Sequence, residues 1–181
     1  MAIYPIRTFG DPVLRTRATA VDEITPSIGT LIDDMVETMY DAPGVGLAAP
    51  QIGVSKRVFV FDAGFGPRAV INPEPVAVDA ETAARSEVPF ELPEDWEDAW
   101  VFDEGCLSVP GYYWPIARPS VYGIRGLDER GDEVLHMGDE LLGRVLQHEY
   151  DHLEGMLLIE RLPTRVRKKA LKELRTDALG I

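Results

Sequence analysis

The chain has 181 residues, which suits one domain with a substantial core, and its hydrophobic content of 45% is ordinary for a globular protein. The net charge of −13 argues against a generally DNA-binding surface. No apolar run approaches the ~18–20 residues that a membrane span needs. The first residues also lack the basic and apolar regions of a signal peptide. We therefore expect a cytoplasmic protein without membrane contact.

The first fifty residues predict one helix and a glycine-rich turn. Residues 1–24 are extended and rich in turns, and apolar residues then recur at helical spacing over 26–41, with Thr25 as N-cap. Residues 43–51 are small and apolar, and they lack the lysine of a phosphate-binding loop. They form either a tight turn or a segment whose backbone approaches a ligand closely, with an amide donor at Gln51.

Two strands and a long acidic stretch follow. Residues 57–62 are a β-rich run, and residues 69–72 predict a second short strand that Pro73 ends. Residues 74–103 carry ten acids against one base, Arg85. We interpret this acidic insertion as a solvated, partly irregular loop with a few apolar anchors.

The only cysteine lies in the segment 104–111, so no intrachain disulfide can form. Cys106 is either a small buried hydrophobe, as lone cysteines usually are, or a metal-ligating thiolate. Residues 107–109 suggest a strand edge. The aromatic residues 112–114 that follow suggest core or a pocket wall.

A hairpin and an apolar helix come next. Residues 120–127 and 133–137 predict two strands joined by a short loop. His136, on the second strand, has no partner at ligand spacing, so we interpret it as structural or exposed. Asp139 then caps a helix that is apolar on more than one side and that Gly155 ends.

The chain finishes with an apolar strand or bend over 156–159 and a helix over about 163–176. Residues 161–175 carry seven bases against one acid. Since short strands alternate with few helices, the predicted fold class is α+β. We expect a single catalytic domain over 1–181, in which mainly antiparallel short sheets pack around the apolar helix, with a basic helix at the C-terminal end.

The apolar helix carries a His-Glu-x-x-His motif. His148 and His152 are four residues apart and therefore lie on the same face of a helix, where both imidazoles can reach one metal ion. Glu149, beside the first histidine, is placed to handle the proton of a metal-bound water. Catalytic metal sites usually combine three protein ligands with one open position, so a third ligand is expected.

The candidates for that third ligand are Cys106 and a downstream carboxylate, namely Glu154, Glu160 or Glu173. Glu154 is only two residues beyond His152 and points away from the ligand face. Cys106 has a glycine before it in a strand-like segment, and we consider it the stronger choice.

Three segments together resemble the three signature motifs of the peptide deformylase family. They are residues 44–51 (GVGLAAPQ), 104–108 (EGCLS) and 147–153 (QHEYDHL), in this order. The resemblance extends from the first helix to Leu158. It implies a metal-dependent hydrolase that removes the formyl group from the N-formylmethionine of nascent peptides and releases formate.

By this resemblance, Cys106, His148 and His152 hold a divalent metal. The ion is iron(II) in most bacterial members, and zinc, nickel or cobalt are substitutes. Water fills the fourth position, and Glu149 takes its proton so that the hydroxide attacks the formyl carbon. Glu149 then protonates the leaving amine.

The resemblance also implies how the substrate is held. The side-chain amide of Gln51 and the backbone N–H of Leu107 bind the developing oxyanion. Gly46 binds the substrate backbone, and Gly105 is a further substrate-binding residue. Three further residues line the apolar pocket for methionine: Val45, Leu141 and Val145.

Two features depart from the commonest family pattern. The segment between Gln51 and Cys106 is longer than in many members. Residues 111–113 (GYY) stand where many bacterial members carry a polar residue and an arginine. Peptide preference beyond methionine therefore does not follow from the resemblance.

The basic C-terminal helix has two interpretations. Clustered lysines and arginines on an acidic protein suit contact with ribosomal RNA phosphates near the nascent chain. The alternative is a solvated helix that balances the acidic loop. We expect a monomer in either case.

Two other functions compete with deformylation. A small zinc metallopeptidase would use a downstream carboxylate as ligand and make Cys106 dispensable. A degenerate homologue that serves only as a binding protein is the second rival, but Glu149 and all three candidate ligands are intact.

Overall fold

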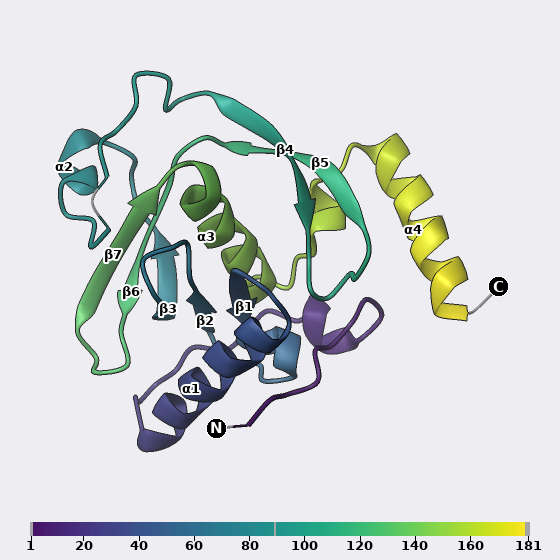
Figure 1. Cartoon of the computed structure of the whole chain (residues 1–181), viewed down its shortest axis with the longest axis horizontal. Coiled ribbons are helices and arrows are strands. Elements are labelled where there is room, and N and C mark those ends of the chain that lie inside the picture. The colour runs from purple at the N-terminus through teal and green to yellow at the C-terminus, as the bar shows by residue number, and fades with distance from the viewer. Residues whose placement is uncertain (1, 89, 180–181) are drawn as a thin grey trace.

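The computed structural model describes residues 2–88 and 90–179, with helix α3 (Glu140–Leu153) at the centre of the molecule (Figure 1). A five-stranded sheet lies on one side of α3. Its order is β1 (Gly46–Ala48), β2 (Val58–Phe61), β3 (Arg68–Pro75), β6 (Tyr122–Leu127) and β7 (Glu133–Gly138), with every neighbouring pair antiparallel. A hairpin of β4 (Ala99–Gly105) and β5 (Tyr113–Pro119) lies on the other side.

Strand β2 is buried on both faces of the sheet. Successive side chains of a strand point to opposite faces. Val58 and Val60 pack in one core cluster with helix α1 (Pro26–Asp41), whereas Phe59 and Phe61 pack in a second cluster with α3. The apolar run of this strand is therefore sandwiched between two helices.

Helix α3 begins and ends where the sequence predicts. Asp139 is the N-cap residue, and Gly155 follows the C-cap with a φ of +73°. A Cβ atom on Gly155 would also lie 2.9 Å from the carbonyl carbon of Arg15, so both conformation and space favour glycine. Buried residues occur on several faces of the helix, as its all-round apolar pattern predicts.

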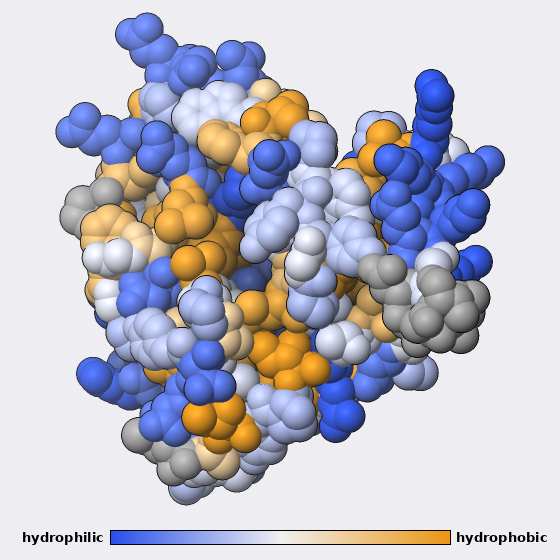
Figure 2. Space-filling view, turned by 45° about the vertical axis from the view of Figure 1, so that its right-hand side comes forward, coloured by the Kyte–Doolittle hydropathy of each residue, from blue (hydrophilic) through white to orange (hydrophobic). Residues whose placement is uncertain are grey.

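Short elements complete the chain. They are the 3₁₀ helices η1 (Pro12–Arg15), η2 (Ala49–Ile52) and η3 (Leu158–Arg161) and the helical turn α2 (Ala80–Ala83). Helix α4 (Thr164–Leu179) lies at the outer edge of the molecule and packs inward through Ala170 and Leu174 (Figure 1). Hydrophilic side chains crowd the part of the surface over α4 (Figure 2). Within residues 2–88 and 90–179, every helix is too short or too polar to cross a membrane.

The fold class is confirmed as a mixed α+β unit with antiparallel sheets and a C-terminal helix, but three local predictions are wrong. Strand β3 continues through Pro73 to Pro75 instead of ending at Pro73. The pairing of β3 with β6 shifts register between Ile71 and Glu74, where Asn72 has a φ of +52°. A proline is tolerated at such an irregularity because the ladder hydrogen bonds are already interrupted there.

The acidic stretch 74–103 is also more structured than a solvated loop. It includes α2, and its last residues form β4. Ala83 of α2 is buried against Leu135 and Met137 of β7. Five partly buried side chains of the stretch pack on the same cluster: Val76, Val78, Phe90, Leu92 and Trp96.

The third error concerns residues 107–109, which form a turn rather than a strand edge. The Val109 N–H donates to the carbonyl oxygen of Cys106 at 2.9 Å. The turn carries the chain from β4 into β5, a strand that the sequence did not predict.

Candidate metal site and active site

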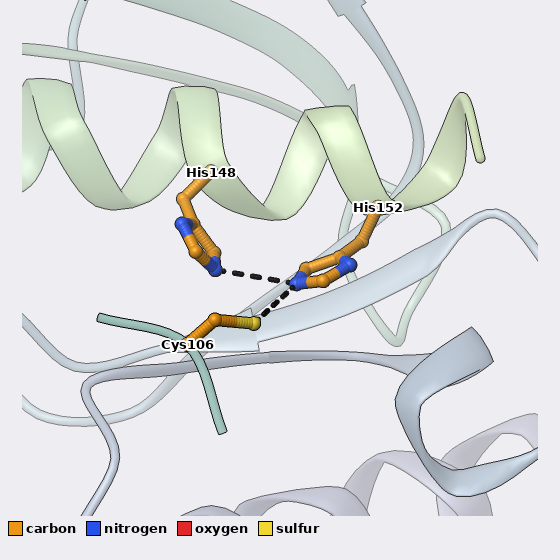
Figure 3. Close-up of side chains that lie close together, drawn as sticks. All are labelled: Cys106, His148 and His152. Atoms are coloured by element: carbon orange, nitrogen blue, oxygen red, sulfur yellow. Dashed lines mark hydrogen bonds between the residues drawn. The ribbon is translucent and has the colours of Figure 1, made fainter. Parts of the chain in front are cut away.

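Three side chains from two segments of the chain meet at one point (Figure 3). Sγ of Cys106 lies 3.2 Å from Nε2 of His152, which lies 3.2 Å from Nε2 of His148. The three candidate ligand atoms all lie within 4.8 Å of one another. In a tetrahedral site with bonds of about 2.0–2.3 Å, ligand atoms are roughly 3.3–3.6 Å apart. The donor set and its spacing therefore fit one metal ion.

The alternative carboxylate ligands lie elsewhere. Glu154 pairs with Arg57 at 2.6 Å, and Glu160 pairs with Arg15 at 3.6 Å. In the part of the chain that the structure describes, Cys106 and the two histidines are the only group of three such residues close enough to share an ion.

Glu104 sets the orientation of one candidate ligand. Its Oε1 lies 2.6 Å from Nδ1 of His148, which leaves Nε2 free to face Cys106 and His152. Burial opposes the ionisation of Glu104, but hydrogen bonds from Arg118 and His148 outweigh it and hold the pKa of this carboxyl well below its usual range. Glu104 is therefore a carboxylate that fixes both the tautomer and the ring of His148.

Glu104 belongs to a buried ionic network. Arg118 donates to both Glu104 oxygens, at 2.8 and 2.7 Å, and to Oδ2 of Asp151 at 3.0 Å. Arg144 donates to Glu104 at 3.0 Å, and Arg161 donates to both oxygens of Asp151. The network ties β4, β5, α3 and η3 together around the candidate ligands. Breaking one pair would leave a buried charge uncompensated.

Glu149 has the properties of a proton acceptor in a dry site. Its side chain is 3% exposed, and Oε2 has no hydrogen-bond partner among residues 2–88 and 90–179. Burial raises the pKa of Glu149 to about 7, although His148 acts in the opposite direction. A carboxyl with a pKa near neutrality can both accept and return a proton at physiological pH.

Nδ1 of the candidate ligand His152 is also buried, and it has no hydrogen-bond partner among residues 2–88 and 90–179.

Gln51 places an amide beside the candidate ligands. Its Oε1 accepts from the Ala48 N–H at 2.8 Å, which orients the amide so that Nε2 faces Oγ of Ser108 at 3.3 Å and Sγ of Cys106 at 3.8 Å. The side chain is 1% exposed, so this donor is fixed before any ligand arrives.

A pocket of about 450 Å³ opens onto the same point. Its lining includes His148, Glu149 and Cys106, together with all the residues that the family resemblance assigned to substrate and oxyanion: Val45, Gly46, Gln51, Gly105, Leu107, Leu141 and Val145. His152 is 1% exposed and does not line the pocket.

Two glycines allow the pocket walls to approach closely. A Cβ atom on Gly46 would lie 2.6 Å from Cγ2 of Val145, and one on Gly105 would lie 2.5 Å from the Tyr113 ring.

The aromatic segment 112–114, which was predicted to form either core or pocket wall, contributes to both. Trp114 is buried in the core, whereas Tyr113 is 70% exposed and lines the pocket.

The ionic network was not predicted from the sequence. For Arg118 a signal was present, because Trp114, Ile116 and Arg118 alternate along β5 and all three face inward. An arginine on the buried side of a strand needs an acidic partner. Asp151, which lies between the two histidines of the motif, is the other network residue whose position in the sequence could have drawn attention to it. Nothing in the sequence indicates that these two side chains meet.

The comparison with known families agrees with the site. A model of the polypeptide deformylase family matches residues 3–168. The chain belongs to this family. Members of the deformylase family depend on a metal ion, and the group formed by Cys106, His148 and His152 could hold one.

Individual deformylases match over most of the chain. The peptide deformylase of Acidothermus cellulolyticus is 45% identical over 175 residues, which cover 97% of this chain and 87% of that protein. The peptide deformylase of Clostridium botulinum is 45% identical over 161 residues, covering 89% of this chain and 97% of that protein.

Solved deformylase structures have the same fold. The crystal structure of the Thermotoga maritima enzyme aligns with a TM-score of 0.78 at 41% identity and covers 90% of this chain and 99% of its own. The peptide deformylase of Synechococcus elongatus, solved in complex with actinonin, aligns with a TM-score of 0.79 at 34% identity, covering 94% of this chain and 85% of its own.

Proposed function

We propose that this chain hydrolyses the formyl amide of N-formylmethionyl nascent peptides and releases formate. The observation that carries the proposal is the meeting of Cys106, His148 and His152 next to a pocket that Glu149 also lines, with one Glu149 oxygen that has no hydrogen-bond partner in the described part of the chain. Membership of the deformylase family supports the same reaction.

We propose Cys106, His148 and His152 as the ligands of a divalent ion, which is iron(II) in the cell. When bound, the ion supplies a nucleophile at neutral pH, since it lowers the pKa of a water molecule from about 15.7 to roughly 7. By affinity order alone an N₂S site binds zinc, nickel or copper over iron, so iron rests on the family. Zinc, nickel and cobalt are the substitutes we propose.

In this proposal Glu149 moves the proton. It accepts a proton from the water that attacks the formyl carbon, and it then donates that proton to the amine nitrogen as the carbon–nitrogen bond breaks. Its pKa of about 7 suits both steps. The products are formate and a peptide with a free methionine amine.

Two neutral donors stabilise the charge that develops on the formyl oxygen. They are the Nε2 amide of Gln51 and the backbone N–H of Leu107. Because the substrate is a neutral amide, donors that meet a charge only in the transition state accelerate the reaction without binding the substrate more tightly.

The pocket is proposed to take the methionine side chain and the adjoining backbone. Gly46 and Gly105 leave room for the peptide backbone, and apolar side chains take the methionine: Val45, Leu141 and Val145. Val45 and Leu141 are 44% and 48% exposed, so they form an open rim that a peptide can cover.

Product analysis separates this function from that of a small zinc peptidase. Metal-loaded protein should convert formyl-Met-Ala-Ser to formate and intact Met-Ala-Ser. Cleavage between the amino acids, with no formate, would support the peptidase. In a matched experiment, Cys106→Ala should lose the metal that wild-type protein retains; full retention would mean that Cys106 is not a ligand.

We also propose that the protein acts in the cytoplasm as a monomer and that α4 brings it to the ribosome. The exposed side chains Lys168, Lys172 and Arg175 lie on α4, whose packing depends instead on Ala170 and Leu174. Basic groups on such a surface suit RNA phosphates and give salt-dependent binding.

A charge-matched pair of variants tests the ribosome contact. One changes Lys168, Lys172 and Arg175 to Gln, and the other changes three exposed arginines elsewhere to Gln: Arg85, Arg125 and Arg130. Only the α4 variant should lose co-sedimentation with ribosomes at low salt. Equal binding by both variants would favour a solvated helix that merely balances the acidic stretch.

A further inference from the structure

The ionic network around His148 reaches the surface at one side chain. Arg161, the last residue of η3, is 42% exposed. The other four members are at most 14% exposed: Glu104, Arg118, Arg144 and Asp151. Arg161 is thus the outer end of a charged chain whose inner end is a candidate metal ligand.

The contacts along this chain are continuous. The Arg161 guanidinium forms a fork on Asp151, with Nε donating to Oδ2 at 3.0 Å and Nη2 donating to Oδ1. Oδ2 of Asp151 also accepts from Nη1 of Arg118 at 3.0 Å. Arg118 forms a second fork on Glu104, whose Oε1 lies 2.6 Å from Nδ1 of His148.

Arg118 is therefore shared between two carboxylates. Without Arg161, Oδ1 of Asp151 loses the donor that the structure gives it, and Arg118 becomes the principal cation for Asp151. In a buried, low-dielectric network that imbalance draws Arg118 toward Asp151 and away from Glu104.

We propose that Arg161 is a positioning residue for the metal site, which acts on His148 through this chain of contacts. The inference rests on the proposed metal site and adds to it a residue that touches neither metal nor substrate. Groups that orient metal ligands commonly alter metal affinity or activity by about 10–100-fold when they are removed. His148 alone has such support, because Nδ1 of His152 has no partner in the described chain.

The test compares Arg161→Gln with a matched control, Arg15→Gln. Arg15 is 45% exposed and pairs at 3.6 Å with Glu160, which also belongs to η3. Within the described residues, neither of these two side chains forms an ion pair with a member of the network. Each protein is loaded with cobalt(II). Its visible absorption spectrum reports ligand geometry, and its rate of cobalt release to a chelator reports retention.

Arg161→Gln is expected to shift the cobalt spectrum and to release the metal about tenfold faster than wild type. Arg15→Gln should change release by less than about twofold, because exposed ion pairs contribute little. Thermal unfolding of the metal-free proteins separates these effects from a general loss of stability.

Three results would contradict the inference or its basis. An unchanged spectrum and release rate in Arg161→Gln, even with a lower melting temperature, would reduce Arg161 to a structural role. If that variant does not fold, Arg161→Lys keeps the charge but loses the fork; release as slow as in wild type would then overturn the proposal. Failure of wild-type protein to bind cobalt would instead overturn the metal site itself.

Discussion

The α-carbon of Gly46 faces the carboxylate of Glu149 so closely that any side chain at position 46 would overlap it. A Cβ atom there would lie 2.9 Å from Cδ of Glu149 and 2.6 Å from Cγ2 of Val145. Strand β1 and helix α3 therefore come together at Glu149, and a larger residue at position 46 would fit only if the Glu149 and Val145 side chains moved.

Gly46→Ala should inactivate the protein without unfolding it. Displacing Glu149 by about 1 Å is expected to lower kcat/KM for formyl-Met-Ala-Ser by about 100-fold. The control is Gly29→Ala in α1, where a Cβ atom meets nothing within 4 Å. That variant should keep full activity and gain about 0.5–1 kcal/mol of stability. Normal kcat/KM in Gly46→Ala would show that Glu149 is not held where we place it.

The amide of Gln51 offers a second test. Gln51→Glu keeps the shape and the bond from the Ala48 N–H but replaces the proposed oxyanion donor with an acceptor. We expect kcat to fall by about 100–1,000-fold with little change in KM. Ser108→Ala, which removes only the hydroxyl beside the amide, should have a much smaller effect. A change confined to KM would point to ground-state binding instead.

His136 predicts a pH-dependent stability that has nothing to do with catalysis. This buried ring packs edge-on against Phe61 at 5.2 Å. Burial, helped by the charge of Arg68, lowers the pKa of His136 to about 4. The unfolded chain therefore binds one more proton between pH 6.5 and about 4, and stability falls as pH decreases through that window.

The contribution of this histidine is measurable with His136→Leu. In urea unfolding, wild type should lose up to about 1.4 kcal/mol per pH unit more than the variant within the window. The other titrating groups are common to both proteins and cancel in the difference. Parallel curves for the two proteins would mean that His136 titrates normally in the folded state.

The proposed iron site also predicts that the protein is sensitive to air. Cys106 is partly exposed, and a thiolate bound to iron(II) is open to oxidation. Protein purified in air should lose activity, and reloading with nickel or cobalt should restore it. Full retention of activity by the iron form in air would count against iron as the metal or Cys106 as a ligand.

Features that depend on local spacing were predictable from the sequence. The two histidines four residues apart required one helical face, and α3 begins at Glu140 and ends at Leu153 between its predicted cap residues. The apolar repeat over residues 26–41 also depends only on local spacing, and it correctly predicted helix α1. For the third ligand the sequence left carboxylates open as alternatives. The glycine before Cys106 in its strand-like segment favoured the thiolate, and the family motifs supported the same choice.

Features that depend on contacts between distant segments were not predictable. Arg118 and Asp151 are 33 positions apart and meet only because β5 lies against α3. The acidic stretch was predicted in part. Its charged side chains are exposed and apolar anchors such as Trp96 pack on β7, as expected, but the helical turn α2 and strand β4 within it were not predicted.

Formate release tests the central claim most directly. Wild-type protein and Glu149→Ala are loaded with the same amount of nickel, and formate from formyl-Met-Ala-Ser is measured over time. Wild type should release formate, and the variant should be slower by about 100–10,000-fold while it still holds its metal. No formate from metal-loaded wild type, or an equal rate from Glu149→Ala, would contradict the account.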